Sequence, residues 1–452
     1  MSVVRQTMDI VFYRLICRLN PLSFNYRFLY STSHLAGPLV RKRMAEQRTS
    51  SGSVQEHFSW MNKLAPCFRV NGRQVEIIRD PSVFYSTLMV NCIQKAVSRE
   101  TSSIKDHSNN LCSSRLKVHI LLDCNRGSRG ARNSRSMLIP LLRDFPEQVK
   151  VSMFHSPDLR GLWKRWLPER YNEVVGLQHM KIYIFDDNVL LSGANLSESY
   201  FTNRQDRYVI IRECRPLADF FHKLITSVSS VSFTLKADDT LELADGLKHH
   251  PYNEPDNGEA YRAEAKQKIM DVIDSSKSGF ENKIGTSSGE QTDTWIYPLI
   301  QMGPFRITQD YDITQRLFQK APEKSHIKLA SGYFNLTDKY VATILGQSVA
   351  SFNILTASPE EYKQQGWTFH AKGLWLYLPH QILPSMTLMG SPNFEAQVAI
   401  VTENNHLRKQ LHLEQHELYS KSTSLTETVL KRRYQQVPLW VVFVTPIIRK
   451  FF

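Results

Sequence analysis

Two short segments of the chain each carry a histidine and a lysine two positions apart. They are His179-Met-Lys181 and His370-Ala-Lys372. On a β-strand, residues two apart point to the same side, so we expect each pair to lie on a strand and project together. Imidazole can attack phosphorus, a second imidazole can move protons, and ammonium groups stabilise charge on phosphoryl oxygens. The two pairs therefore predict phosphoryl transfer.

A turn rich in small and polar residues follows each pair. The turns are Gly193-Ala-Asn195 and Gly390-Ser391-Pro-Asn393, which can return an amide and backbone N–H groups toward the same end of the sheet. A single such motif is weak, because a half-buried strand with a hydrogen-bonded histidine explains it equally well. Two copies, each followed by a similar turn, are much less likely to arise by chance than one. The sequence offers no carboxylate cluster for Mg²⁺, so we expect neither a metal nor a cofactor.

Composition narrows the classes of function further. The chain has 452 residues, with 56 Lys and Arg against 43 Asp and Glu, giving a net charge of +13 that suits an anionic partner. A hydrophobic content of 42% excludes global disorder. No apolar run approaches the ~20 residues of a bilayer span, which excludes a multi-span membrane protein. The six cysteines form no C-x-x-C pair, so neither a zinc site nor a disulfide scaffold is indicated.

Strand and helix patterns alternate along the chain and predict an α/β fold. The expected strands are 117–123, 149–154, 177–186, 328–334 and 352–357, and the expected helices are 137–145 and 336–345. A polar, Ser- and Gly-rich segment at 275–294 reads as a linker or surface loop.

The paired motif resembles the phospholipase D superfamily. Within it, much of the chain looks like the eukaryotic mitochondrial phosphatidylglycerophosphate synthases, in stretches such as ILLDCNRGSRGARNSRSMLIPLL, LQHMKIYIFD, LSGANLSESYFTNRQDRYV and GWTFHAKGLWLY. The resemblance implies two phospholipase-D-like halves packed face to face with one shared active site. It also implies transfer of a phosphatidyl group from CDP-diacylglycerol to glycerol 3-phosphate, with release of CMP.

The same resemblance implies roles for individual residues. His179 would be the nucleophile and His370 the acid and base, although the two could exchange roles. Asp186 would complete the first motif by orienting nearby groups, and Asp206 would hydrogen-bond a catalytic histidine. Groups that bind substrate or phosphate would be Lys181, Lys372, Asn195, Ser391, Asn393 and Glu395. Arg126 and Arg129 lie in a Gly-rich basic loop that can cradle a pyrophosphate, or simply be solvated.

The chain departs from the family pattern in several places. Tyr377 replaces the aspartate that the superfamily has in the second motif, a departure that the synthases share. Glu395 follows Asn393 by two positions, whereas Asp206 follows Asn195 by eleven. The first half offers only residues 98–114 where an opening strand is expected, and the segment between 359 and 367 is shorter than in relatives. These gaps raise the alternative of an inactive, shortened form.

The ends of the chain suggest where the protein acts. Residues 1–44 contain seven basic residues and one acid, which is typical of a mitochondrial transit peptide. Residues 430–452 combine an apolar stretch with cationic flanks, which fits docking on an anionic membrane or packing on the core. The remaining divisions are a first half at 57–230, a connecting region at 231–294 and a second half at 295–429. The expected location is peripheral, on the mitochondrial inner membrane.

A nuclease or phosphodiesterase using the same two pairs is the main competing function. Net charge fits both enzymes, but the leader and the C-terminal apolar patch favour a lipid substrate, so no nucleic acid is expected as partner.

Overall fold

The computed structural model of the chain describes residues 53–87, 117–131, 133–161, 177–281, 292–332, 336–357, 368–390, 395–422 and 424. Strands and helices alternate through these residues, so the predicted α/β class is confirmed. The predicted leader at 1–44 and the predicted tail at 430–452 lie outside the described residues. Among the helices that are described, none combines the length and the apolar character needed to cross a bilayer.

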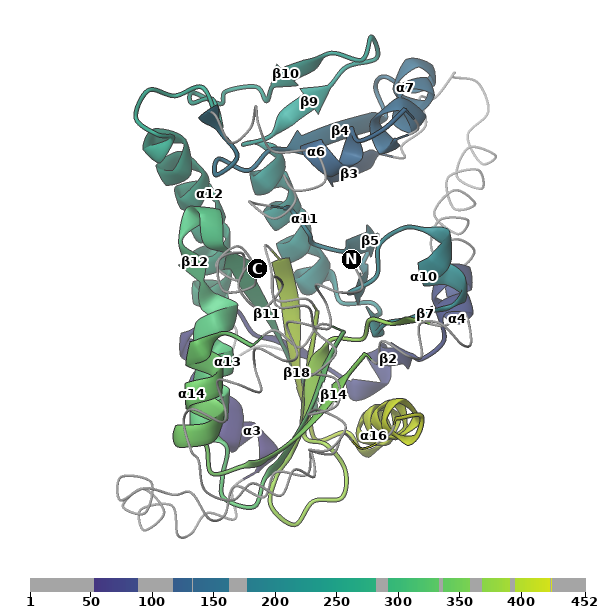
Figure 1. Ribbon diagram of the computed structural model, residues 1–452, viewed down its shortest axis with the longest axis vertical. Helices are drawn as coiled ribbons and strands as arrows, with labels where there is room; N and C mark the ends of the chain where they lie inside the picture. The colour runs from purple at the N-terminus through teal and green to yellow at the C-terminus, as the bar shows by residue number, and fades with distance from the viewer. Residues whose placement is uncertain are drawn as a thin grey trace, which may run out of the picture.

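The largest sheet of the described residues has eight strands. Figure 1 shows several of them, among them β11, β14 and β18. Its order is β1 (Phe68–Val70), β11 (Thr294–Met302), β18 (Glu395–Thr402), β17 (Met386–Met389), β16 (Gly373–Tyr377), β13 (His326–Ser331) and β14 (Ser351–Thr356), with β12 (Ile307–Thr308) paired to β11. Neighbouring strands are antiparallel except β13 and β14, which run parallel.

Two smaller sheets and one strand pair complete the β structure of the described residues. One sheet has the antiparallel order β2 (Val75–Ile78), β8 (Tyr208–Ile211), β6 (Asn188–Ser192) and β5 (Ile182–Phe185). The other has the order β10 (Leu241–Leu243), β9 (Phe233–Leu235), β4 (Val149–Phe154) and β3 (Val118–Asp123), with β3 and β4 parallel. The short strands β7 (Arg204–Gln205) and β15 (Thr368–Phe369) pair with each other and tie the two parts of the chain together.

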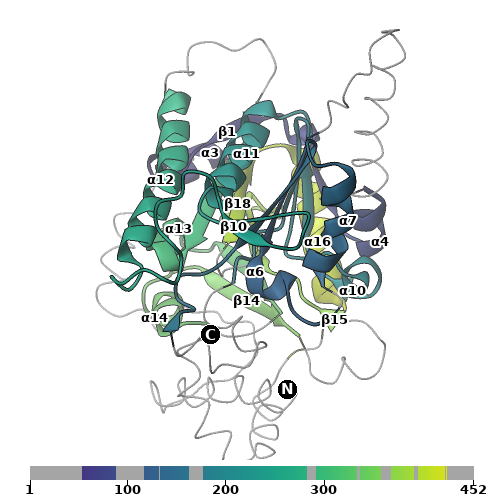
Figure 2. The same ribbon diagram turned by 90° about the horizontal axis from the view of Figure 1, so that it is seen from above.

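Helices connect and cover these strands (Figures 1 and 2). They are α3 (Val54–Phe58), α4 (Pro81–Ser86), α6 (Cys124–Gly127), α7 (Ser134–Asp144), α10 (Glu198–Thr202), α11 (Arg215–Ser229), α12 (Glu259–Glu281), α13 (Gln309–Lys320), α14 (Asp338–Gly346) and α16 (Asn405–Ser420), with 3₁₀ turns η2 (Ser59–Lys63), η3 (Gly72–Gln74) and η5 (Gly303–Phe305). Strands β3, β4 and β14 confirm the predicted strands at 117–123, 149–154 and 352–357, and α7 and α14 confirm both predicted helices. The strand predicted at 328–334 is confirmed as far as Ser331, and residues 333 and 334 lie outside the described residues. Helix α12 runs to Glu281, so the start of the predicted polar linker is helical.

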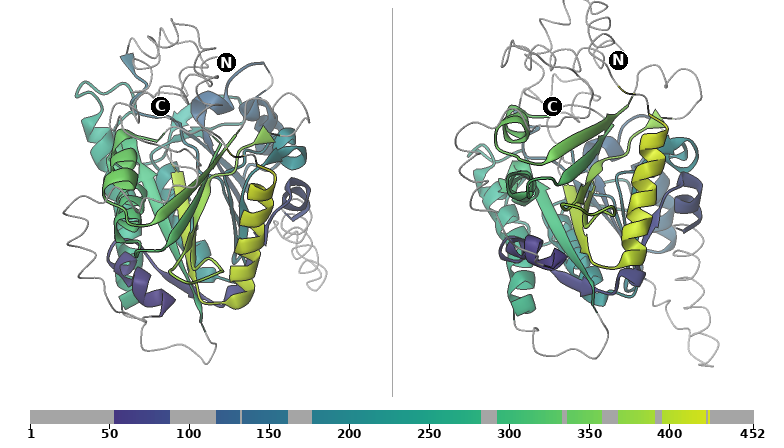
Figure 3. Two further views of the ribbon diagram at one scale, coloured as in Figure 1. Left: turned by 60° about the horizontal axis from the view of Figure 1, so that its bottom comes forward. Right: turned by 90° about the horizontal axis from the view of Figure 1, so that it is seen from below.

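Alternate residues of the large sheet enter two different cores, as the two-residue period of a strand requires. On β11, Ile296 and Ile300 belong to one core, and Tyr297 and Leu299 belong to the other. Helices α3, α13 and α14 cover the second face, while α16 lies against the first (Figure 3). The first core also takes in residues of β6, β8, α11 and α12, so the inner faces of two sheets share one hydrophobic interior.

The same strand order occurs twice. Strands β2, β5, β6 and β8 are ordered β2-β8-β6-β5, and strands β11, β16, β17 and β18 are ordered β11-β18-β17-β16. In the large sheet, β13 then joins β16 to β14. No strand of the described residues joins β5 to β3, and the sheet is interrupted there. Side chains along both of these strands are only half-buried over Val118–Leu122 and Ile182–Phe185. Residues 98–114, the expected place of an opening strand, lie outside the described residues.

A buried ion pair fastens β8 to the large sheet. Arg207 directly precedes β8 and is 1% exposed. Its guanidinium donates to both carboxylate oxygens of Glu414 on α16, at 2.9 and 2.7 Å, and to the carbonyl oxygen of Leu388 at 2.7 Å. It also stacks over the ring of Trp375, 3.8 Å from the centroid, and the indole N–H donates to Glu414 at 2.9 Å. The charges are therefore matched and hydrogen-bonded, as burial demands.

We expect Glu414→Gln to lower the free energy of unfolding by about 3–5 kcal/mol, because it leaves the Arg207 cation buried without a counter-charge. Glu76→Gln is the matched control. It breaks the 2.7 Å pair with Arg212, whose side chains are 46% and 40% exposed, and should change stability by less than about 1 kcal/mol. Urea unfolding followed by tryptophan fluorescence measures both variants. Equal losses in the two would contradict the anchoring role.

Candidate active site

The second His-Lys pair lies in a short connection between β15 and β16. The sequence placed it on a strand, which is wrong, because β16 begins only at Gly373. The pair nevertheless projects together, with the ammonium of Lys372 3.3 Å from Nε2 of His370. Gly373 has a φ of +127°, and a Cβ there would lie 2.1 Å from the carbonyl oxygen of Leu388. Glycine is therefore what allows the chain to turn from the pair into the strand.

Asp206 holds the ring of His370 from its other side. The carboxylate oxygen Oδ2 lies 2.6 Å from Nδ1, and the two residues are 2% and 6% exposed. Because a carboxylate accepts, Nδ1 carries the proton and Nε2 presents its lone pair. The other oxygen of Asp206 accepts from the backbone N–H of Arg207 at 2.8 Å. A Cβ at Gly193 would lie 2.6 Å from that oxygen, so the predicted Gly turn makes room for the carboxylate.

A tyrosine of the first part of the chain reaches the same histidine. The hydroxyl of Tyr200, on α10, lies 3.2 Å from Nε2 of His370, and the two rings meet edge to face. The amide Nδ2 of Asn195 donates to that hydroxyl at 3.4 Å. Tyr200 and Asp206 therefore contact an imidazole that lies far from them in sequence, and Asn195 contacts the hydroxyl of Tyr200.

Burial lowers the pKa of His370 below its ordinary value of 6.5. The hydrogen bond and charge of Asp206 oppose this shift, whereas the cations of Lys372 and Arg204 reinforce it. The imidazole is consequently neutral at neutral pH, with Nε2 able to take a proton.

The first His-Lys pair also precedes its strand rather than lying on it, because β5 begins at Ile182. Lys181 is 8% exposed and its ammonium donates to the backbone carbonyl of His179 at 2.7 Å. The backbone N–H of the neighbouring Gln178 donates to Asp123 at 3.0 Å. The buried Asp123 thereby fixes the segment that carries His179.

Comparison with known proteins identifies the family. No family model matches the chain. The mitochondrial CDP-diacylglycerol–glycerol-3-phosphate 3-phosphatidyltransferases of Homo sapiens and Mus musculus are 42% and 41% identical to it, over 87% of this chain and 86% of each relative. The chain belongs to the CDP-diacylglycerol–glycerol-3-phosphate 3-phosphatidyltransferase family. The Schizosaccharomyces pombe phosphatidyltransferase is 28% identical over 87% of this chain and 97% of its own length. The predicted resemblance is therefore confirmed.

One solved structure of another enzyme has a fold similar to that of this phosphatidyltransferase family member. The crystal structure of phosphatidylserine synthase from Haemophilus influenzae Rd KW20 superimposes with a TM-score of 0.57 at 15% identity. The match covers 89% of this chain and 100% of the synthase chain. At such low identity the likeness concerns the fold alone.

Other predicted site residues of this family member lie apart from the His370 cluster or outside the description. Asp186 has a φ of +52° and sits at the exposed turn between β5 and β6, roughly 15 Å along the strand from Lys181. Its orienting role stays a prediction. Ser391 and Asn393 lie outside the described residues, and Glu395 is described only as the backbone start of β18.

Asp123 also connects the predicted basic loop to the first pair. Its Oδ1 accepts from the backbone N–H of Arg126 at 2.9 Å, while its Oδ2 holds Gln178. Arg126 and Arg129 are exposed on α6 and the turn after it. The sequence signal for Asp123 was its place at the end of a strand, just before the Gly-rich loop. Tyr200 had no comparable signal, since only the fold brings α10 beside His370.

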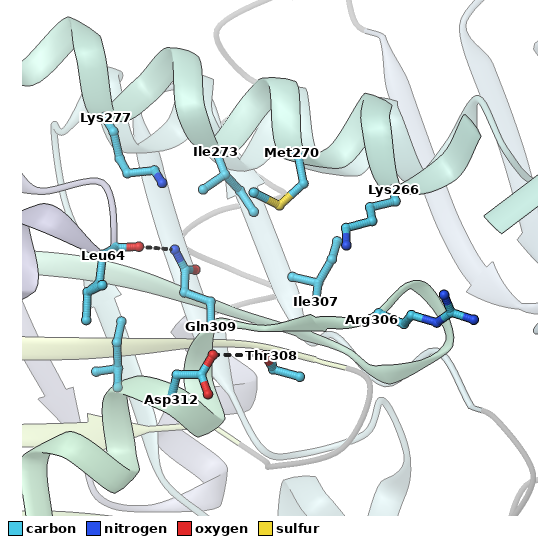
Figure 4. A pocket seen from close by; sticks show the side chains of 11 residues that line it. Leu64, Lys266, Met270, Ile273, Lys277, Arg306, Ile307, Thr308, Gln309 and Asp312 are labelled. Carbon is cyan, nitrogen blue, oxygen red and sulfur yellow. Dashed lines mark hydrogen bonds between the residues drawn. The ribbon is translucent and has the colours of Figure 1, made fainter. Parts of the chain in front are cut away.

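A separate cavity of about 250 Å³ lies between α12 and the start of α13 (Figure 4). Lys266 and Lys277 extend into it from α12, and the opposite wall has both apolar and polar side chains, among them Ile307, Gln309 and Asp312 (Figure 4). The charge of Lys277 is matched by Asp274 at 2.7 Å. None of the predicted catalytic residues lines this cavity, so it is distinct from the candidate site. Within the part of the chain that the structure describes, no three His, Cys, Asp or Glu side chains gather as metal ligands.

We expect Asp206→Asn to reduce kcat by about 10²- to 10⁴-fold, because a neutral amide no longer stabilises the imidazolium of His370. The substitution is isosteric, so circular dichroism should be unchanged. In the wild type, activity should fall as pH drops through the pKa of His370, which lies below 6.5. In Asp206→Asn this acidic limb should move to still lower pH.

Asp219→Asn, at an exposed carboxylate on α11, is the control. Wild-type kcat in Asp206→Asn, or an acidic limb that stays in place, would rule out the assigned role of the carboxylate.

Proposed function

We propose that the chain transfers a phosphatidyl group from CDP-diacylglycerol to sn-glycerol 3-phosphate, giving phosphatidylglycerophosphate and CMP. The observation that carries the proposal is the buried, neutral His370 held between Asp206 and Lys372 in a chain 42% identical to a phosphatidyltransferase. The fold likeness to a phosphatidylserine synthase also supports it.

In the first step, a nitrogen of His179 attacks the phosphorus of the phosphatidyl group. An N–P bond forms, the P–O bond to CMP breaks, and CMP departs with that oxygen and its electron pair. A phosphate monoester with a second pKa of about 6 is a good leaving group, so it needs little proton donation. Lys181 and Lys372, each 8% exposed, stabilise the developing charge on the phosphoryl oxygens in a low-dielectric site.

In the second step, Nε2 of His370 takes the proton from the hydroxyl of glycerol 3-phosphate. The hydroxyl oxygen attacks the phosphohistidine, forming the new P–O bond while the N–P bond breaks. An alcohol is a poor nucleophile without a base, so this is where the lowered pKa of His370 matters most. Asp206 stabilises the resulting imidazolium across 2.6 Å.

The two repeated strand orders and the hydrophobic core that they share support two phospholipase-D-like halves around one site. We place the enzyme in mitochondria, on the surface of the inner membrane. The mitochondrial designation of the human and mouse relatives and the basic leader at 1–44 support that compartment, and the apolar tail with cationic flanks at 430–452 supports membrane contact. Its substrates are then a membrane lipid and a soluble anion.

We expect His179→Ala to lower formation of phosphatidylglycerophosphate by at least about 10³-fold, because no N–P intermediate can form at that position. The assay is CMP release from CDP-diacylglycerol in detergent micelles, with and without glycerol 3-phosphate. His222→Ala, at an exposed histidine on α11, is the control.

Wild-type turnover by His179→Ala would refute the nucleophile assignment. Cleavage of oligonucleotides in place of CMP release would favour the nuclease. A wild-type chain as inert as His179→Ala would show that this shortened form is inactive.

We expect EDTA to leave the chemical step unchanged, because lysine ammonium groups rather than a metal ion hold the phosphoryl oxygens in this mechanism. Single-turnover CMP release in micelles measures the step without a contribution from membrane binding. A strict requirement for Mg²⁺ in that single turnover would contradict the mechanism.

A further inference from the structure

Tyr200 occupies an unusual position beside the proposed base. It is 2% exposed, and its ring packs in a small core with Phe84 and Tyr208. The guanidinium of Arg204 lies 4.7 Å from the centre of the ring, and the edge of the His370 ring meets it at a centroid distance of 5.2 Å. These contacts fix the ring, so the hydroxyl is held at 3.2 Å from Nε2 of His370.

The hydrogen-bonding capacity of the two groups at Nε2 differs. The ammonium of Lys372, at 3.3 Å, can only donate. The hydroxyl of Tyr200 can donate or accept by rotating its hydrogen about the C–O bond. The hydroxyl oxygen already accepts from Asn195 at 3.4 Å, which leaves its own hydrogen available for Nε2 while the ring is neutral.

We propose that Tyr200 is a positioning residue whose hydroxyl serves Nε2 of His370 in both protonation states, donating to the neutral imidazole and accepting from the imidazolium. Nε2 has one lone pair, so the hydroxyl hydrogen turns away when the acceptor alcohol donates to Nε2. Once Nε2 has taken the proton of the alcohol, Nε2–H donates to the phenol oxygen. No covalent bond to Tyr200 forms or breaks. The catalytic consequence rests on the proposed function, whereas the hydrogen-bond exchange does not.

The charged groups around the ring determine the sign of the effect. Asp206 faces Nδ1, while Lys372 and Arg204 are the nearby cations that disfavour the imidazolium. Tyr200 adds a hydrogen-bond acceptor beside Nε2, the ring nitrogen that Lys372 also approaches. A hydrogen bond to a charged group is stronger than one to a neutral group, so loss of the hydroxyl penalises the imidazolium more than the imidazole.

The test is Tyr200→Phe in the full-length chain in micelles, which keeps the ring and removes the hydroxyl. We expect the pKa of His370, followed by NMR of isotope-labelled histidine and assigned with His370→Gln, to fall by about one unit, a tenfold change in the protonation equilibrium. The acidic limb of kcat/KM should move to lower pH by the same amount, and kcat should fall about tenfold. KM for glycerol 3-phosphate should be unchanged.

Tyr208→Phe is the matched control. Tyr208 is a buried tyrosine of the same small core, and its hydroxyl donates to the backbone carbonyls of Tyr200 and Arg204 at 3.4 Å. We expect it to lower stability as Tyr200→Phe does while leaving the His370 titration in place. A His370 titration that is the same in wild type and Tyr200→Phe would overturn the proposal.

Site-specific replacement of Tyr200 by 3-fluorotyrosine covers the case in which Tyr200→Phe fails to fold. Fluorine makes the phenol a better donor and a poorer acceptor, so the pKa of His370 should again fall, and a rise or no change would overturn the proposal. The titration needs no turnover. A wild type that makes no phosphatidylglycerophosphate would therefore refute the proposed function while this result remains measurable.

Discussion

Two adjacent residues of opposite charge, Asp206 and Arg207, link the first part of the chain to the second. Asp206 binds His370 at 2.6 Å, and Arg207 binds Glu414, Leu388 and Thr387 at 2.7–2.9 Å. Both are 2% exposed or less, so neither charge can be left without its partner. The ion pair that fastens the sheets is therefore also what places the carboxylate against the imidazole. Stability and the geometry of the proposed base depend on the same dipeptide.

The site is a compromise between two opposing electrostatic demands. Phosphoryl oxygens require cations, which the buried Lys181 and Lys372 provide in the proposed mechanism. The same mechanism needs His370 to accept a proton, yet burial and the cations of Lys372 and Arg204 disfavour the imidazolium that results. Asp206 restores part of the lost stabilisation at Nδ1. The hydroxyl of Tyr200 is placed to do the same at Nε2.

The sequence predicted most of the residues proposed to take part in the chemistry, but few of the residues that hold them in place. Two His-Lys pairs were visible because chance rarely repeats such a motif with matching turns. The resemblance to known synthases pointed to Asp206, and the fold puts it against His370. The pairs were wrongly placed on strands, since periodicity could not show that strands begin only at Ile182 and Gly373. Tyr200, Arg207 and Glu414 could not be found from patterns along the chain, because their contacts join residues that are far apart in the sequence.

The interruption between β3 and β5 has a consequence for how the protein behaves in solution. In the part of the chain that the structure describes, each of these strands ends its sheet, with backbone N–H and C=O groups along one side. Uncovered strand edges are templates for pairing with another polypeptide. The large sheet has no such opening between β16 and β14, because β13 fills it. Among the described residues, an extended segment can therefore pair in solution at the edge of β3 or of β5, and neither strand carries a residue proposed for catalysis.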